Sequence, residues 1–539
     1  MRMTSSIKGF KFPAKAKATL YLLTTTGLTI SAANQLYSPS FPDNITAVIH
    51  GVLRSSRAFA TIALSVADYK YSLWRLPVDS DDYQHQLSEV HFRSAKRIMK
   101  LCEANKGFYV KAGQFVATMR QVPNEYSSTL SSLQDQAVPC HFKAIKEVLI
   151  GNLGDDLSKI FISFDEKPIA AASIAQVHHA VLKNHEEVAV KVQYPGLERQ
   201  MTIDRSTMSF LSKSVEWLFP EYRFAWLVPE FANTISLELD FIQEARNAER
   251  TSKNFENNDV VMVPRVFWGL TTNKVLTMQF CSGHKVDNVD FLKEIGVNPT
   301  EVAKSLIEVF AEMIFINGFV HGDPHPGNIL VCPKGPKGFS LVLLDHGVYK
   351  QLDEGFRQDY CQLWKALILL DSQKIQQLAE RFGVGKYSRY FPVIFTGRTI
   401  DSKSILGRGM SANEKRSLKQ ELKSLKLEDI SSFMESLPPD FLTILRIDGL
   451  LRSVLTKLGA PQRVRLLVYV KHAVYGLSPK LKVDSDSAIR VLFHKFMTSG
   501  SYLQLRIVLG ALELLHCLEK VKQFFKAFCR KISGTTMII

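Results

Sequence analysis

Two short runs of alternating hydrophobic residues mark the first strands that the sequence predicts. Residues 176–182 and 187–192 are rich in β-branched side chains and alternate apolar with polar positions. This period of two is typical of a strand with one buried face. The polar residues between the runs, 183–186, predict a tight hairpin. A third run, 339–344, is continuously apolar, as in a buried strand.

Longer stretches repeat their apolar residues with the helical period. We expect helices over residues 46–75, 94–120, 237–249, 299–319 and 356–370. The first of these carries charged residues along its length, so it is not expected to span a membrane. The chain therefore mixes strands with helices and is mainly helical in its second half.

The sequence HGDPHPGN, from His321 to Asn328, carries the most informative chemistry. Asp323 is followed five residues later by an asparagine, and Asp345 lies 17 residues beyond that, at the end of the third apolar run. Phosphoryl transfer uses one carboxylate to orient the nucleophile, and an amide oxygen with a second carboxylate to hold magnesium. We therefore interpret the stretch as part of a kinase-type site, with Asp323 catalytic and Asn328 and Asp345 as metal ligands.

The partner residues that such a site requires are present upstream. Lys191 lies in the second predicted strand, within the sequence Val-Ala-Val-Lys. This matches the strand lysine that contacts the α- and β-phosphates of ATP in kinases. Its carboxylate partner is expected on a later helix, and Glu244 lies in the middle of the predicted helix 237–249. Lys191 alone is equally consistent with a solvated lysine at a strand end, but the full set is not.

Two features depart from an ordinary protein kinase. Where a glycine-rich phosphate loop is expected, residues 168–177 contain no glycine and three consecutive alanines. Because alanine resists the backbone conformations that glycine allows, we expect a stiffer, more helical loop. Gly322 replaces the arginine of the H-R-D motif, and no A-P-E follows Asp345. An activation segment switched by a phosphate–arginine contact is therefore not expected.

In order along the chain, these motifs resemble those of the AarF/UbiB (ABC1) family of atypical kinase-like proteins. They are Lys111 to Gln114 (KAGQ), the alanine loop with Ser173 and Gln176, Lys191, Glu238 to Asp240 (ELD) with Glu244, His321 to Asn328, and Asp345 to Gly347 (DHG). The resemblance covers about residues 95–350. It implies an α+β, bilobal protein-kinase-like fold with a small β-rich N-lobe and a helical C-lobe. An N-terminal helical extension would carry the K-x-G-Q motif, and a helical extension would follow the C-lobe.

The motifs and the resemblance together assign roles to individual residues. Catalysis is assigned to Asp323, Lys191 and Glu244; nucleotide binding to Ala170, Ala171, Ala172, Ser173, Lys191, Met278, Gln279 and Phe280; magnesium to Asn328 and Asp345; and regulation to Lys111, Gln114, Glu238 and Asp240. ATP and Mg²⁺ are the implied cofactors.

The regulatory role comes from the resemblance alone. In such proteins the K-x-G-Q helix packs over the place where a protein substrate would otherwise bind, and the E-x-D motif helps to hold it there. Lys111 and Gln114 would then face the nucleotide, with Glu238 and Asp240 as tethers. From the residues alone, Lys111 and Gln114 form a solvated polar stripe on one helix face, and the two acids are exposed charges.

The chain begins with a basic segment. The formal net charge is +15, and no acidic residue occurs before Asp43. Such a start resembles a mitochondrial presequence. It is followed by residues 18–33, which are uncharged but shorter than the roughly 20 residues that span a bilayer. A cleaved presequence, a bipartite presequence with a membrane anchor and a secretory signal peptide are the alternatives, the first two favoured. An anchor would place the kinase-like body in the intermembrane space.

The rest of the sequence sets broad limits. We expect a targeting segment over residues 1–45, a helical extension over 46–140, a kinase-like domain over 141–480 and a C-terminal helical segment over 481–539. This last segment contains a very apolar stretch followed by lysines and arginines, which suits either a membrane surface or packing against the C-lobe. The seven cysteines show neither zinc-ligand nor disulfide spacing. No nucleic-acid-binding module is recognised, so no nucleic-acid partner is expected.

Three functions remain open. The first is an ATP-dependent enzyme, a kinase or an ATPase, acting at the mitochondrial inner membrane. The second is a nucleotide-gated scaffold or lipid-binding pseudokinase without phosphotransfer. The third is an ordinary Ser/Thr protein kinase, which the missing glycines and arginine disfavour. The expected partners are ATP and ADP, membrane lipids or isoprenoid-like small molecules, and inner-membrane proteins.

Overall fold

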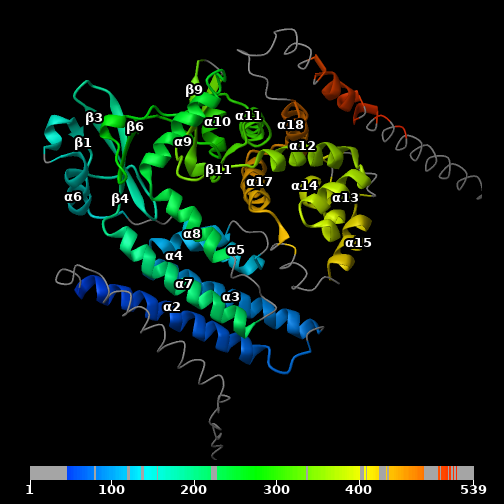
Figure 1. Ribbon diagram of the computed structural model, residues 1–539, viewed down its shortest axis with the longest axis horizontal. Coiled ribbons are helices and arrows are strands. Elements are labelled where there is room, and N and C mark those ends of the chain that lie inside the picture. Colours follow the sequence, from blue (N-terminus) through cyan, green and yellow to red (C-terminus); the bar gives the residue numbers. More distant parts are fainter. Residues whose placement is uncertain are drawn as a thin grey trace, which may run out of the picture. The chain divides into compact units, whose positions relative to one another are not determined.

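The computed structural model divides the chain into two compact units (Figure 1). Unit 1 comprises residues 1–245 and 265–280, and unit 2 comprises residues 246–264 and 281–539. The structure describes residues 45–77, 80–117, 122–134, 139–154, 156–219, 227–335, 338–400, 406–407, 409–423, 433, 436–478, 496–497, 499–507, 509–511, 514 and 518. The predicted targeting segment 1–45, except for its last residue, and most of the predicted segment 481–539 lie outside these residues.

Unit 1 contains a five-stranded antiparallel sheet. Its main path runs in the order β1-β3-β4-β6, and β2 pairs with β3. The strands are β1 (Phe161–Phe164), β2 (Ala170–Ala171), β3 (Ala175–Leu182), β4 (Glu187–Gln193) and β6 (Val275–Gln279). The predicted hairpin is confirmed as β3 and β4, whose register pairs Val181 with Glu187. Alternating burial along β3 matches the period of two read from the sequence.

Helices make up the rest of unit 1. They are α2 (Ile45–Ser72), α3 (Asp81–Asn105), α4 (Phe108–Ala117), α5 (Asn124–Leu130), α6 (Phe142–Leu153), α7 (Leu197–Leu218), α8 (Leu227–Glu238) and α9 (Phe241–Asn254), which continues into unit 2, with short 3-10 turns η1 (Ser131–Gln134), η2 (Leu157–Lys159) and η3 (Trp268–Leu270). The helix α4 contributes to two cores. Phe108 and Ala112 pack with the sheet and α8, whereas Tyr109 packs with α2, α3 and α7.

Unit 2 has two small sheets and a helical body. One sheet has the order β5-β10-β9-β7 and the other pairs β11 with β8. The strands are β5 (Val261–Met262), β7 (His284–Lys285), β8 (Phe319–His321), β9 (Ile329–Lys334), β10 (Gly338–Leu343) and β11 (Tyr349–Gln351). The helices are α10 (Val289–Glu294), α11 (Pro299–Ala311), η4 (Glu312–Asn317), η5 (Pro326–Asn328), α12 (Glu354–Leu369), α13 (Ser372–Arg381), η6 (Gly385–Tyr390), α14 (Phe391–Thr396), α15 (Ala412–Lys423), α17 (Pro439–Lys457) and α18 (Gln462–Gly476).

Three predicted helices are shorter than expected. The helix over 94–120 is broken between α3 and α4, because Lys106 and Gly107 both adopt positive φ angles. The prediction of one continuous helix over 237–249 is wrong, since α8 ends at Glu238 and α9 begins at Phe241. The helix over 299–319 widens into the π-helical turn η4 and ends at Gly318, which has a φ of 65°. Phe319 therefore begins a strand.

No helix among the described residues is long and apolar enough to cross a membrane.

Candidate active site

Unit 1 carries the predicted pair of Lys191 and Glu244. Lys191 lies on β4 and Glu244 in the first turn of α9. The Lys191 Nζ atom lies 2.7 Å and 2.9 Å from the two carboxylate oxygens of Glu244. The ammonium also lies 5.1 Å from the centre of the Phe241 ring, a cation–π contact. The predicted pairing is confirmed, and it is almost fully buried, with side-chain exposures of 11% and 1%.

The break between α8 and α9 is what positions Glu244. Asp240 accepts hydrogen bonds from the backbone N–H groups of Ile242 and Gln243 through Oδ1, so it caps the start of α9. Gln193, at the end of β4, donates from Nε2 to the carbonyl of Leu239. The strand that carries Lys191 is thereby tied to the segment that begins the helix of Glu244. Asp240, expected to be a tether, is in this structure a helix cap.

The alanine loop is not helical, so that prediction is wrong. Ala170 and Ala171 form the strand β2, which pairs with Val177 and Gln176 of β3. The turn closes when the N–H of Ala172 donates to the carbonyl of Ala175, at 2.8 Å. Alanine favours a helix by less than about 1 kcal/mol per residue, and the paired sheet hydrogen bonds outweigh that preference.

Ser173 lies within this turn, and its side chain is a candidate ligand contact. Its hydroxyl oxygen is buried and has no hydrogen-bond partner among the described residues. A buried hydroxyl without a partner costs free energy, so its place in a phosphate-loop position suits an oxygen-rich group supplied from outside. The two alanines of β2 pair with β3 through their backbone.

The other predicted nucleotide-binding residues are at the end of β6. Met278 is buried in the core of unit 1 and pairs with Ala189. Gln279 ends the strand, and the N–H of Phe280 donates to the carbonyl of Glu187. Gln176 has a structural role that the sequence did not show, because its Oε1 accepts from the N–H of Cys140, which precedes α6.

Unit 2 holds the acidic residues, and strand register brings them together. Asn328 immediately precedes β9. Asp345 lies just after β10, with Leu344 between them. These strands form a hairpin in which Ile329 pairs with Leu343, and the N–H of Leu344 donates to the carbonyl of Asn328. Asp323 joins the group because Asn328 donates from Nδ2 to its carbonyl, at 3.1 Å.

His321 links the two aspartates through their backbone. Its Nδ1 accepts from the N–H of Asp323, at 3.0 Å, and its Nε2 lies 2.5 Å from the carbonyl of Asp345. Only the neutral ring with its proton on Nε2 satisfies both contacts. His346 is also buried, and its carbonyl accepts from Asn247 of α9. Nothing in the sequence motif marks either histidine for this positioning role.

Steric crowding explains why position 322 is a glycine. A Cβ atom there would lie 2.6 Å from Cγ1 of Val348. Arg446 of α17, far along the chain, donates from Nη2 to the carbonyl of Gly322, at 2.6 Å. An arginine therefore contacts the catalytic loop although the H-R-D arginine is missing. No motif in the sequence near Arg446 marks this residue as part of a site.

The residues present suit magnesium and a nucleotide. Magnesium is typically held by one or two carboxylates together with substrate phosphates. The described residues contain no group of three or more histidine, cysteine, aspartate or glutamate side chains that could hold a metal by themselves. Asn328 donates from its amide N–H₂ group to Asp323. Its amide oxygen, Oδ1, is not used in this contact and can serve as a metal ligand. The carboxylate and amide oxygens of unit 2 are therefore of the kind that magnesium prefers.

The K-x-G-Q motif is held within unit 1. Lys111 Nζ lies 2.8 Å and 3.0 Å from the carboxylate oxygens of Glu238. Gln114 donates from Nε2 to the carbonyl of Leu133, at 2.9 Å. Gly113 allows this approach, because a Cβ atom there would lie 2.5 Å from Cδ1 of Leu133. The Lys111–Glu238 contact joins α4 to α8, as a tether requires. Gln114 instead donates to the backbone carbonyl of Leu133.

We expect a measurable coupling between Lys111 and Glu238. Their side chains are 20% and 11% exposed, so the pair is partly shielded from solvent. Lys111→Ala and Glu238→Ala should each destabilise unit 1, and the double variant should be less than additive by about 1 kcal/mol. Urea denaturation of the four proteins measures this cycle. Strict additivity would show that the contact contributes nothing.

Buried histidines make stability depend on pH. Burial lowers the pKa of His321 below its usual value of about 6.5, and the same cause lowers the pKa of His178 and of His472. A lowered pKa in the folded state means that the stabilisation is complete above pH 6.5 and is lost as the pH falls below it. Each such group contributes at most about 1.4 kcal/mol per pH unit.

The free energy of unfolding should therefore decrease between pH 7 and pH 5. Urea denaturation at several pH values measures it, and His321→Gln should show a shallower decrease than the unaltered chain. A stability that is flat over this range, or that increases on acidification, would contradict the neutral state assigned to these rings.

A buried lysine–glutamate pair joining a strand to a helix, and an Asp–Asn–Asp set on a hairpin loop, define a protein of the kinase-like class. Residues 132–379 match the ABC1 atypical kinase-like domain.

Relatives extend the match over most of the chain. It is 39% identical over 409 residues to AarF domain-containing protein kinase 1 of Gallus gallus, which covers 75% of this chain and 78% of that protein. It is 36% identical over 498 residues to the protein of the same name in Mus musculus, covering 91% and 94%. It is 36% identical over 470 residues to the probable serine/threonine-protein kinase abkD of Dictyostelium discoideum, covering 86% and 67%. The chain belongs to the ABC1 (AarF) family of atypical kinase-like proteins, as the motifs indicated, and the expected α+β kinase-like fold is confirmed.

Proposed function

We propose that the chain binds Mg-ATP and uses it as an atypical kinase or ATPase. The observation that carries this proposal is that the lysine, the glutamate, the two aspartates and the asparagine of a kinase-type site are all present. Lys191 and Glu244 form their pair, and Asp323, Asn328 and Asp345 are joined by the β9–β10 hairpin and by His321. A pseudokinase usually loses at least one of these residues.

Each residue then has a defined task. Lys191, held by Glu244, would contact the phosphates of a bound nucleotide. Asp323 orients the attacking hydroxyl or water and accepts its proton. Asn328 and Asp345 would hold magnesium. The bound cofactor supplies a phosphoryl group with charge-neutralising metal, and the protein supplies position and electrostatic complementarity.

Phosphate release from Mg-ATP by the intact chain tests the proposal. We expect slow, magnesium-dependent turnover that Asp323→Asn reduces by about 100-fold or more. The variant should fold normally, because Asp323 contacts His321 and Asn328 mainly through backbone atoms. Turnover that is equal in the variant would contradict the catalytic assignment.

A second candidate is a nucleotide-gated scaffold without phosphotransfer. It is supported by the Lys111–Glu238 contact, which ties the K-x-G-Q helix to α8 rather than leaving Lys111 in solvent. Saturable Mg-ATP binding with no phosphate release would select this alternative. Strong phosphorylation of generic peptides by the intact chain would instead select an ordinary protein kinase.

We further propose that the chain acts at the mitochondrial inner membrane on lipids or isoprenoid-like molecules. The support is the basic, acid-free start of the sequence. Residues 1–33 fused to a fluorescent protein should therefore bring it to mitochondria. A reporter that stays in the cytosol or enters the secretory pathway would contradict this location.

A further inference from the structure

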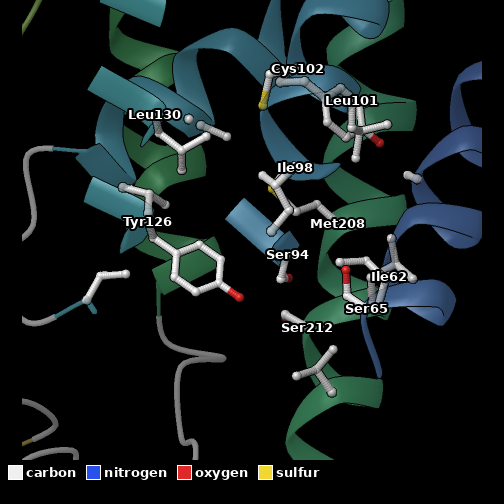
Figure 2. Close-up of a pocket in the computed structure, with 18 of the residues that line it drawn as sticks. Ile62, Ser65, Ser94, Ile98, Leu101, Cys102, Tyr126, Leu130, Met208 and Ser212 are labelled. Carbon is white, nitrogen blue, oxygen red and sulfur yellow. The ribbon is translucent and has the colours of Figure 1, made fainter. Parts of the chain in front are cut away.

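The helices of unit 1 line a partly open cavity that no step of the proposed function uses. It has a volume of about 380 Å³ and is lined by residues of α2, α3, α4, α5, α7 and α8, which Figure 2 shows in close-up. Cavities of about 300–1,000 Å³ hold ligands of drug or lipid size. Well-packed proteins contain few voids larger than a water molecule, so a space of this size is a binding-site candidate.

The walls of the cavity are hydrocarbon. They include Ile62, Ile98, Leu101, Met208, Leu211 and Phe231. The described residues that line the cavity include no lysine, arginine, aspartate or glutamate. An ionised group placed inside would have no opposite charge to pair with, and burying it would cost several kcal/mol. The walls therefore select an uncharged, largely apolar molecule.

A group of hydrogen-bonding side chains in the lining gives the cavity a polar region. The hydroxyl of Tyr69 lies 2.5 Å from Nδ1 of His91 and 2.8 Å from the hydroxyl of Tyr126. Figure 2 shows the ring of Tyr126 extending from α5 toward Ser94. Burial lowers the pKa of His91, so this region is neutral at physiological pH. Neutral donors and acceptors suit a hydroxyl or carbonyl group.

Ser65 of α2 is a lining residue whose hydroxyl group lacks a hydrogen-bond partner among the described residues. This serine is only 6% exposed. A helical serine can bond to a carbonyl one turn back, and Ser206, Ser214 and Ser236 do so. Ser65 therefore carries an unsatisfied hydroxyl against an apolar space, which a ligand with one polar atom would satisfy.

We propose that this cavity binds an uncharged lipid with a single hydrogen-bonding head, of the long-chain alcohol class. The hydrocarbon body fills the space between α2, α3 and α7. The hydroxyl head bonds to Ser65, which lies one helical turn before Tyr69 of the polar region on α2. A pure hydrocarbon would leave Ser65 unsatisfied, and a small polar molecule would leave the apolar walls uncovered.

A series of ligands with one chain and three heads tests the proposal on the intact protein. Hexadecan-1-ol, hexadecane and hexadecanoate are delivered in cyclodextrin at pH 7.5, and the dissociation constant is measured for each. We expect hexadecan-1-ol to bind about fivefold more tightly than hexadecane, because it adds one hydrogen bond. It should bind at least about 100-fold more tightly than hexadecanoate, whose charge is not paired. Equal affinities for alcohol and carboxylate, or no binding of the alcohol, would overturn the proposal.

Substitutions in the cavity lining test whether hexadecan-1-ol binds there. Ser212 of α7 lines the cavity, whereas Ser214 lies on the same helix but does not. Ser212→Phe should fill the space and weaken binding of hexadecan-1-ol at least tenfold, and Ser214→Phe should leave it unchanged. Ser65→Ala should abolish the preference for the alcohol over hexadecane while keeping the binding of hexadecane. Binding that survives Ser212→Phe in a folded protein, or an unchanged preference in Ser65→Ala, would contradict the assigned site.

Discussion

Asp345→Asn is expected to abolish the stabilisation of the chain by Mg-ATP. Asp345 is the carboxylate ligand proposed for magnesium, and an amide cannot supply its charge. A ligand present at 100 times its dissociation constant stabilises the folded state by about 2.7 kcal/mol, which corresponds to a rise of about 2–5 °C in Tm for units of this size. The unaltered chain should show this rise in a thermal-shift assay, and the variant should not.

The same variant should fold normally without nucleotide. Asp345 Oδ1 accepts from the N–H of Gly347, at 2.9 Å, and asparagine also has an oxygen that accepts. Asp371→Asn is a matched control in the same unit, because Asp371 caps α13 and asparagine caps equally well. If Asp345→Asn still responds fully to Mg-ATP, the metal assignment is wrong.

Glu244→Leu should strongly destabilise unit 1. It removes the carboxylate from a pair whose side chains are 11% and 1% exposed and leaves the Lys191 ammonium without this partner. Breaking a buried ion pair in this way costs about 3–5 kcal/mol. Urea denaturation, followed through the transition that includes unit 1, measures the loss.

The double variant distinguishes an unpaired charge from lost packing. Lys191→Met with Glu244→Leu removes both charges, and an apolar replacement of a buried pair is often neutral. We therefore expect the double variant to recover most of the stability while remaining unable to bind nucleotide through Lys191. A double variant as unstable as Glu244→Leu alone would show that the pair does not behave as a buried ion pair.

The strands and site residues were predictable because each carries a local pattern. The alternation over 176–192 defined the β3–β4 hairpin, and the apolar run over 339–344 defined β10. Once these strands are placed, Lys191 and Asp345 follow from their positions along them. The spacing of Asp323 and Asn328 within one loop required no knowledge of tertiary contacts.

The errors arose where tertiary contacts outweigh local preference. Periodicity could not show that the chain turns at Lys106 and Gly107, or that Asp240 begins a new helix. Alanine propensity predicted a helical loop, but pairing with β3 makes residues 170–171 a strand. Arg446 reaches Gly322 from 124 residues away, and such a contact leaves no signature in the sequence. The cavity was hidden for the same reason, since its lining comes from six helices.

Equilibrium binding of labelled ATP to the intact chain, with magnesium varied from zero to millimolar, tests the central claim most directly. We predict saturable binding to one site that requires magnesium and is lost in Asp345→Asn. Absence of saturable binding, or binding that neither magnesium nor Asp345 affects, would contradict the assignment of a Mg-ATP site to this chain.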